Sequence, residues 1–365
     1  MHESGTRETS KSIDSLKGIA MLGILLVHSR IIFSGKYEIL NCVINSGARG
    51  VQLMFVLNGY LIFKSLDRAF QRETSLKEWY KRKALRILPL YWIFTILHLV
   101  VFGRGERFYL GPLKEVSWVN IICNLLCVHG FFPYYINSIN VNWFIADLMI
   151  WYLIAPFVYK RLNSLKKILS GTLFIVPVVY CLIMVIQKHP IISNEAIWND
   201  YVSILCFLPE LPAILLGCII YWLEKEHKTT VIDKQMSRGM LIFAFIAVLL
   251  LISGSNMFYV FSNIFSFALI FALILVIQLT NPTRLLCNGV FQAFGRHSYG
   301  IYLSHLFVIS FVWNVIDSVK GLSLGNRMSA LIYFMICVCS LVVAVGVEKV
   351  YGYIANLLKH RRIAG

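Results

Sequence analysis

A lysine and a histidine lie in the first apolar stretch of the chain, SIDSLKGIAMLGILLVHS, residues 12–29. Lys17 stands near its start and His28 near its end. On a helix these eleven residues correspond to about 16 Å and to three turns plus about 20°, so both side chains share one face. Lys17 alone is typical of a snorkelling residue at a membrane boundary, and His28 alone of a hydrogen-bonded packing histidine. An imidazole at membrane depth is costly, however, and therefore favours a functional role such as proton transfer.

A basic cluster lies in SLKEWYKRKALRILPLYW, residues 75–92. Ser75 and Glu78 form a capping box that begins a helix, and Pro89 is expected to break or kink that helix as it enters the membrane. The cations three to four residues apart are Arg82, Lys83 and Arg86. They can be presented together to a polyanion such as phosphate, although ordinary basic cytoplasmic topology explains them as well.

A polar stripe occurs in FGRHSYGIYLSHLFVI, residues 294–309, where Ser298, Tyr302 and His305 recur at i, i+4 and i+7. This spacing places a hydroxyl, a phenol and an imidazole on one helix face, with His305 near the middle of the membrane. Tyr302 also fits an interfacial belt residue. His297, at the start of the stripe, is interpreted as an interface residue.

Three further polar side chains lie inside apolar runs: Asn58, Asp147 and Glu210. Gly59 beside Asn58 favours a close helix approach. The two prolines that flank Glu210, at positions 209 and 212, indicate a distorted helix that lines a cavity.

The elements that must hold these groups follow from the composition. Of the 365 residues, 58% are hydrophobic and 14% are charged. A helix needs about 20 apolar residues to cross a bilayer core of roughly 30 Å. The sequence therefore predicts an all-α polytopic membrane protein with about ten transmembrane helices. Their apolar cores lie near residues 16–33, 50–63, 87–102, 143–159, 168–187, 202–223, 239–255, 258–279, 297–315 and 329–347.

Lysine and arginine counts predict the orientation of these spans, because cytoplasmic loops retain more basic residues than exported loops. With both termini cytoplasmic, 25 of the 34 lysines and arginines fall on the inside. The asymmetry would largely vanish if residues 116–132 also spanned, and this stretch is the least apolar candidate. We therefore expect 116–132 to be a re-entrant or interfacial segment at the outer face.

One membrane domain is expected to account for most of the chain. It covers residues 13–358, between a disordered cytoplasmic tail at 1–12 and a basic cytoplasmic tail at 359–365. The net charge of +16 requires no nucleic acid partner, because basic cytoplasmic loops facing an anionic leaflet explain it. The nine cysteines form no metal-type pair, so no metal site is expected.

Five motifs, in this order, resemble those of the bacterial membrane acyltransferase-3 family. They are Lys17 and His28 with ten residues between them, FVLNGYLIF, Lys83 and Arg86 before PLYW, WFIADLMIWYLIAP, and GRHSYGIYLSH. The chain departs from the family at Lys17 and Lys83, where arginine is usual, at Asn58, where serine is usual, and at Asp147 inside the fourth motif. The resemblance runs along nearly the whole chain.

The resemblance implies transfer of an acyl group, by default acetyl, from cytosolic acyl-coenzyme A to a hydroxyl of a cell-surface carbohydrate or its lipid-linked precursor. By this analogy His28 and His305 are the catalytic candidates. His28 deprotonates the acceptor or carries the acyl group transiently, and His305 orients His28 or lines the path with Tyr302. The residues expected to bind the acetyl-CoA phosphates are Lys17, Arg82, Lys83 and Arg86. The residues expected along the substrate path are Asn58, Asp147, Glu210, Ser298 and Tyr302.

A transporter or flippase for a lipid-linked sugar is the competing interpretation, with Glu210, Asp147 and the histidines as a proton relay. The chain shows no internal repeat between its halves, and a transporter has no need for the cation cluster. The family resemblance implies the bacterial cytoplasmic (inner) membrane, with O-antigen or another surface polysaccharide as acceptor. The sequence leaves open the hydroxyl that is modified, the acyl chain and the oligomeric state.

Overall fold

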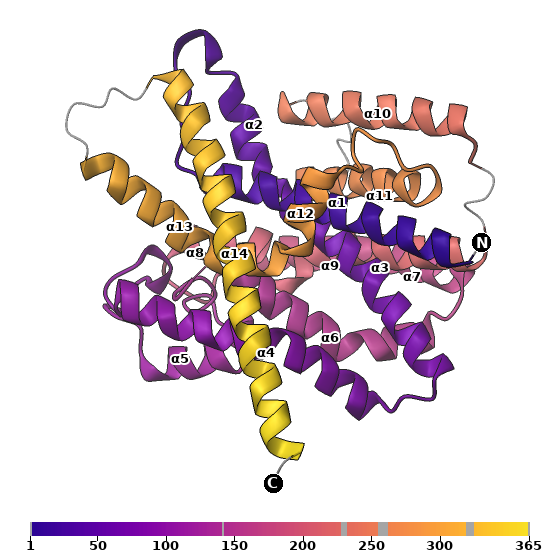
Figure 1. Ribbon diagram of the computed structural model, residues 1–365, viewed down its shortest axis with the longest axis horizontal. Helices are drawn as coiled ribbons and strands as arrows, with labels where there is room; N and C mark the ends of the chain where they lie inside the picture. Colours follow the sequence, from indigo (N-terminus) through magenta and orange to yellow (C-terminus); the bar gives the residue numbers. More distant parts are fainter. Residues whose placement is uncertain (1, 141, 228–231, 255–261, 319–324, 364–365) are drawn as a thin grey trace. The chain divides into compact units, whose positions relative to one another are not determined.

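The computed structural model describes residues 2–140, 142–227, 232–254, 262–318 and 325–363, which form helices joined by loops, with no strand among them (Figure 1). Within these described residues, nine helical segments are long and apolar enough to cross a membrane. The remaining predicted run, 16–33, begins in the first helix, α1 (His2–His28). This run includes Lys17 and follows Lys11 and Asp14. The prediction of an all-α polytopic membrane protein is confirmed.

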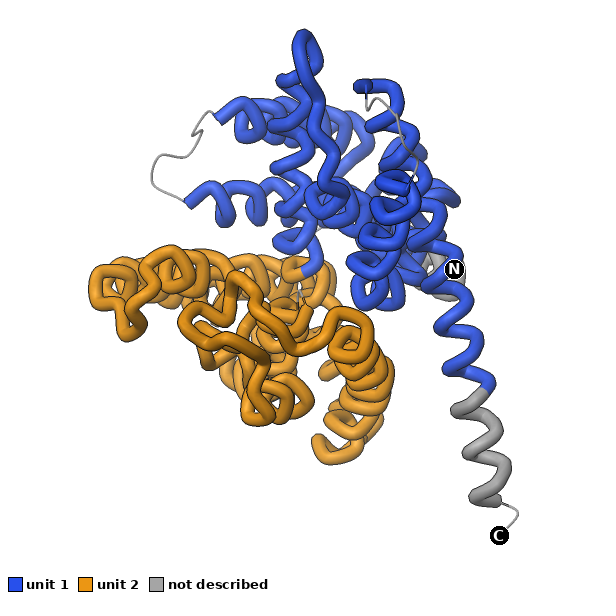
Figure 2. The backbone as a smooth tube through the Cα atoms, turned by 90° about the vertical axis from the view of Figure 1, so that its left-hand side faces the viewer, with its two compact units in different colours: residues 1–54, 230–365 blue, residues 55–229 orange. Residues whose placement is uncertain are grey.

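The chain divides into two compact units, residues 1–54 with 230–365 and residues 55–229 (Figure 2). Besides α1, unit 1 contains α2 (Leu40–Ser46), α10 (Lys234–Ile252), α11 (Asn263–Thr280), α12 (Gly289–Arg296), α13 (Ser298–Ser318) and α14 (Asn326–Ile363). Unit 2 contains α4 (Leu76–Phe102), α5 (Trp118–Leu125), α6 (Trp143–Arg161), α7 (Leu165–Lys188), α8 (Glu195–Asp200) and α9 (Phe207–Lys225). Helix α3 (Gly50–Gln71) begins in unit 1 and continues in unit 2. Short turns are η1 (Gly35–Tyr37), η2 (Gly47–Arg49), η3 (Phe108–Leu110), η4 (His129–Phe131) and η5 (Tyr201–Leu205).

Unit 1 is held together by close packing of α1 on α12 and of α13 on α14. A side chain at Gly295 of α12 would overlap the carbonyl of Asp14, so only glycine permits this contact. His297, between α12 and α13, pairs through Nδ1 with Glu348 of α14 at 2.6 Å. Helices α10 and α11 share a separate apolar core made of Ala244, Ala247, Leu251, Phe267 and Ile270.

The two ends of the chain differ in part from the sequence-based expectation. The backbone of α1 is helical from His2, whereas a disordered tail is expected over residues 1–12. This stretch contains no proline and runs directly into an apolar helix, and adding residues to a formed helix avoids the cost of a new nucleus. The expected basic tail at 359–365 coincides with the last turns of α14, and residues 364–365 lie outside the described part of the chain.

Unit 2 is organised by a close crossing of α3 and α9. A Cβ on Gly59 would overlap the backbone of Ile214, which confirms the predicted close approach at Gly59. Two ion pairs strengthen the same contact. Lys64 lies 3.1 Å from Glu224, and Lys225 lies 2.6 Å from Asp67.

The prolines of two apolar helices, Pro89 in α4 and the pair that flanks Glu210 in α9, were expected to distort the backbone. Pro89 was expected to break or kink α4, but α4 continues through it from Leu76 to Phe102, so the break is wrong. Membrane helices tolerate an internal proline, because neighbouring groups satisfy the freed carbonyl. Around Glu210 the helix α9 continues through both flanking prolines, from Phe207 to Lys225. The irregular backbone lies before α9, where the π-helical turn η5 ends at the extended residue Cys206.

The segment 116–132 does not form a spanning helix. Its helix α5 has 8 residues, about 12 Å, which is less than half of a bilayer core. Its asparagines are buried in a polar network. Asn124 donates to Asn120 at 2.8 Å, Ser138 donates to Asn120 at 2.9 Å, and the Tyr91 hydroxyl donates to the Asn124 carbonyl at 3.0 Å. These bonds hold the segment to neighbouring parts of unit 2. Its location at the outer face of the membrane stays a prediction.

Candidate functional site

The two candidate catalytic histidines lie together in unit 1. His28 is the last residue of α1, His305 lies in the middle of α13, and their ring centroids are 5.3 Å apart. The His305 residue is only 1% exposed, whereas His28 is partly exposed. The buried ring is therefore shielded by protein, and the partly exposed ring is the one that a substrate can reach.

The hydrogen bond of His305 determines which ring nitrogen can accept a proton. Its Nδ1 lies 2.6 Å from the backbone carbonyl of Tyr302. A carbonyl oxygen only accepts, so Nδ1 carries the hydrogen and donates it. The Nε2 lone pair remains, and Nε2 has no hydrogen-bond partner among the described residues. In its neutral form, His305 therefore carries its lone pair on Nε2, in a ring that lies beside His28.

Two aromatic side chains that the sequence analysis missed hold the end of α1 beside α13. Trp313 of α13 donates its indole N–H to the carbonyl of Ser29 at 2.8 Å. Tyr333 of α14 donates its hydroxyl to the carbonyl of Leu22 at 2.8 Å. The first bond holds the backbone next to His28, and the second ties α1 to α14 about 9 Å earlier along the helix. No local pattern links these residues, which are separated by hundreds of positions.

The other predicted site residues of unit 1 are Lys17, Tyr302 and Ser298, and they lie at different distances from the histidine pair along their helices. Helix α1 is unbroken between Lys17 and His28, so their predicted common face is retained. Tyr302 is buried, and its ring centroid lies 5.9 Å from that of His305. Ser298 is buried at the first position of α13, about 10 Å along the helix from His305, too far for direct contact with that ring.

The predicted phosphate-binding residues of unit 2 line one pocket of about 240 Å³ at the α3–α4 turn. Its five cations are Arg68, Arg72, Arg82, Lys83 and Arg86, and no carboxylate is among the residues that line it. This volume is below the roughly 300 Å³ at which sites for whole drug-sized ligands begin. The pocket therefore has room for phosphate groups and not for an entire coenzyme.

Local contacts build this pocket. Ser75 caps α4 by accepting a hydrogen bond from the Glu78 backbone N–H at 3.2 Å, which confirms the first half of the predicted capping box. Trp79 donates its indole N–H to Ser65 of α3 at 3.1 Å and so joins the two helices. Lys83 lies over the Trp79 ring, 5.3 Å from its centroid, which orients the ammonium group.

Arg68 and Arg72 belong to this pocket but were not predicted. Helix α3 ends at Gln71 and α4 begins at Leu76. A connection this short makes neighbouring helices antiparallel, so the last turn of one faces the first turn of the next. That loop length was the signal that relates Arg68 and Arg72 to the cations of α4.

The buried carboxylic acids of unit 2 lie together. Asp147 of α6 and Glu210 of α9 are both 0% exposed, and they interact electrostatically. Neither carboxyl oxygen of Asp147 accepts a hydrogen bond from the described residues. Asn58 lies on α3, next to the Gly59 crossing, and is partly buried. Of the residues predicted along the substrate path, Asp147 and Glu210 therefore form a buried acidic pair in unit 2. Ser298 and Tyr302 lie on α13 in unit 1.

The sequence was compared with known proteins. The sequence model of a family described as an acyltransferase domain matches residues 10–349. O-acetyltransferase OatA of Staphylococcus aureus is 23% identical over 320 residues, and a putative O-acetyltransferase of the same species is 24% identical over 334 residues. Each alignment covers 82% of this chain and 50% of the relative, so the chain spans about half the length of the curated relatives it matches. No solved structure matches the chain. The family match includes both units and every predicted site residue, and the chain therefore belongs to the acyltransferase-3 family.

Proposed function

We propose that this protein is a membrane O-acyltransferase that moves an acyl group, acetyl in the simplest case, from acyl-coenzyme A to a carbohydrate hydroxyl. The observation that carries the proposal is the pair of imidazoles, His28 and His305, 5.3 Å apart in a membrane-embedded unit. Acyl transfer to a hydroxyl needs a group that takes a proton near neutral pH, and imidazole is the side chain suited to that task.

Two routes use this pair. In the first, His28 accepts the proton of the acceptor hydroxyl while the oxygen attacks the thioester carbonyl. The new C–O bond replaces the C–S bond, and His28 returns the proton to the leaving thiolate, so a thiol is released. In the second, the His28 nitrogen attacks the thioester carbonyl, and the new N–C bond replaces the C–S bond as the thiolate leaves. The acceptor oxygen then attacks the acyl-imidazole, its C–O bond replaces the N–C bond, and the hydroxyl proton neutralises the thiolate, so a thiol is released and His28 is restored. In both, His305 is proposed to orient the His28 ring, whose centroid lies 5.3 Å from its own.

The basic pocket of unit 2 supports a phosphorylated donor. Five cations without a lining carboxylate suit the phosphates of acyl-coenzyme A, since guanidinium groups bind phosphate oxygens through paired hydrogen bonds. Lys17, whose face is shared with His28, is proposed to contribute to the same task.

The setting proposed for this reaction is the bacterial cytoplasmic membrane. The 25 inside cations make the cytoplasmic side basic, which suits an anionic donor from the cytosol. The acceptor is then a surface polysaccharide such as O-antigen, or its lipid-linked precursor, modified toward the outer side. Exported loops contribute aromatic side chains, Tyr134 and Tyr135 among them, of a type that stacks on sugar rings.

Transport of a lipid-linked sugar is the second candidate, and the buried pair of Asp147 and Glu210 is the observation that favours it. Carboxylic acids at membrane depth are typical of proton relays. The cation pocket and the imidazole pair are better explained by acyl transfer.

The test combines donor binding with product analysis. Purified wild-type protein in detergent should bind coenzyme A, and this binding should weaken in Arg68→Gln. In cells, O-acetyl content of the surface polysaccharide, measured by mass spectrometry, should disappear on gene deletion. It should return with the wild-type gene but not with His28→Ala. Absence of coenzyme A binding, together with unchanged O-acetyl content, would favour the transporter.

A further inference from the structure

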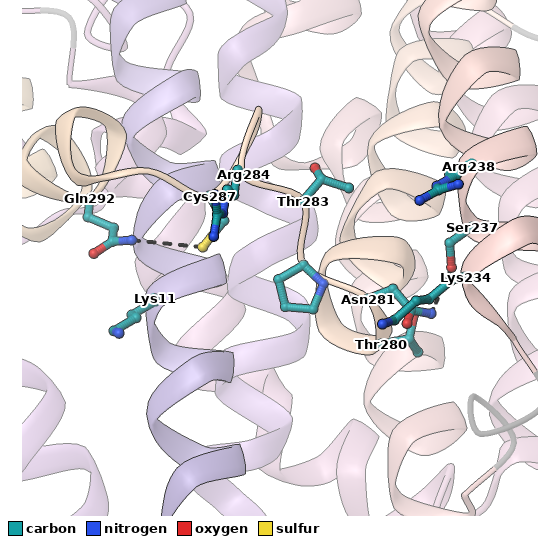
Figure 3. Close-up of a pocket in the computed structure, with 11 residues that line it drawn as sticks. Lys11, Lys234, Ser237, Arg238, Thr280, Asn281, Thr283, Arg284, Cys287 and Gln292 are labelled. Carbon is teal, nitrogen blue, oxygen red and sulfur yellow. Dashed lines mark hydrogen bonds between the residues drawn. The ribbon is translucent and has the colours of Figure 1, made fainter.

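A second basic pocket lies in unit 1, where α1, α12, the start of α10 and the end of α11 meet (Figure 3). Its volume is about 880 Å³, which is enough for a ligand of nucleotide or lipid-headgroup size. Its four cations are Lys11, Lys234, Arg238 and Arg284. Figure 3 shows Lys11 on one wall, Lys234 and Arg238 on the opposite wall, and Arg284 on the connector between them.

These cations are available to a ligand. All four are exposed, and within the described residues none forms an ion pair with a carboxylate. No acidic residue lines the pocket. Asp233 directly precedes Lys234, but its carboxylate accepts the Met236 backbone N–H at 2.7 Å and so caps α10. The concave surface is therefore positively charged without an internal counter-ion.

The pocket walls are braced by hydrogen bonds that leave these cations unused. Asn281, at the end of α11, donates to Ser237 of α10 at 2.8 Å. Gln278 and Thr283 bond reciprocally, at 3.1 Å between side chains and 3.0 Å from the Thr283 backbone N–H. The connector that carries Arg284 is thus held in one conformation before any ligand arrives, which lowers the entropic cost of binding.

Exposed apolar side chains lie close along the chain to residues that line the pocket: Leu285 follows Arg284, Met236 precedes Ser237, and Val290 stands two residues before Gln292. Leu285 is 74% exposed, Val290 is 63% exposed and Met236 is 53% exposed. Exposed apolar side chains next to cations are typical of the membrane interface, where acyl chains and phosphate groups meet. The predicted topology places all three contributing segments, 1–15, 224–238 and 280–296, on the cytoplasmic side.

We propose that this pocket binds the phosphate ester of an anionic ligand, and the exposed apolar side chains beside its lining residues point to an anionic phospholipid headgroup as the source. Four uncompensated cations supply the charge, and Arg238 and Arg284 supply the guanidinium forks that fit phosphate oxygens. The pocket shares no residue with the cation pocket of unit 2, so this proposal does not depend on the proposed acyl transfer.

The experiment uses full-length protein, delipidated in a neutral detergent, and native mass spectrometry with phosphatidylglycerol and phosphatidylcholine of equal acyl chains. The variant is Arg238→Gln with Arg284→Gln. Its matched control is Arg161→Gln with Lys166→Gln, which removes two exposed cations of unit 2 outside both pockets. Inorganic phosphate and adenosine 3′,5′-bisphosphate are titrated by calorimetry to represent soluble sources.

Wild type and control should prefer phosphatidylglycerol over phosphatidylcholine by about tenfold or more, and the pocket variant should lose this preference, since each charge-assisted contact contributes about tenfold. If a soluble phosphate instead binds wild type and control but not the pocket variant, the phosphate site is supported and its ligand is a soluble phosphate rather than a lipid. The proposal is overturned if the pocket variant binds every probe as tightly as the control. Loss of acyl transfer would not affect any of these readouts.

Discussion

Replacing His28 and His305 with alanine, singly and together, tests whether the two imidazoles act as one unit. At 5.3 Å between ring centroids, two protonated rings would repel by about 3 kcal/mol at an effective dielectric constant of about 20. Only one ring of the pair is therefore positively charged at a time. We expect each single variant to lose about a hundredfold to ten-thousandfold in kcat, the range for a lost acid–base group.

Because only one ring can be charged at a time and the pair is proposed to act as one unit, the double variant should be no slower than the worse single variant by more than about threefold. Independent residues would instead multiply their losses. The measurement is transfer of a labelled acetyl group from acetyl-CoA to cell-surface polysaccharide in membranes with matched protein levels.

Folding is the main alternative explanation for a loss, because His305 is buried and its removal leaves a cavity. The matched control is Ser304→Ala, which changes the adjacent buried residue of α13, whose hydroxyl donates only to the Gly300 carbonyl. Ser304→Ala should keep activity within about twofold. Turnover of His28→Ala within tenfold of wild type, or multiplicative losses in the double variant, would refute the reasoning.

Three further predictions follow from single side chains. Arg68→Gln should raise the KM for acetyl-CoA by about tenfold or more with little change in kcat, while Lys77→Gln, an exposed lysine outside the pocket, should leave the KM unchanged; equal KM values would remove Arg68 from the donor site. Lys17→Ala should weaken coenzyme A binding by about tenfold and Lys17→Arg should restore it, whereas equal affinity in all three proteins would make Lys17 a membrane anchor. Burial lowers the pKa of His129 in the folded protein from its usual 6.5 to about 4. The contribution of His129 to the free energy of unfolding is therefore complete above pH 6.5, where the side chain is neutral in both states. About 3 kcal/mol of this free energy should be lost as the pH falls from 6.5 to 4. Thermal melting against pH should show this loss in wild type and not in His129→Gln, and parallel curves would contradict it.

The sequence by itself determined the features that depend on neighbours along the chain. Within the described residues, each of the ten predicted apolar runs overlaps a helix, although the run 16–33 extends past the end of α1 at His28. Length and composition decide whether a segment can satisfy its backbone in lipid. The common face of Lys17 and His28, and the clustering of Arg82, Lys83 and Arg86, follow from helix periodicity alone. Residues 116–132 were predicted not to span because a further span would remove most of the lysine and arginine asymmetry and because this stretch is the least apolar candidate.

Tertiary structure decided the features that join distant segments. The contact between His28 and His305 links residues 277 positions apart, and the unit 1 pocket joins Lys11 to Lys234 and Arg284. Periodicity reports which face a residue occupies but not which helix packs against that face. Those partners are selected by close packing at glycines such as Gly295, by hydrogen bonds such as that from Trp313 to Ser29, and by shape complementarity summed over whole helices.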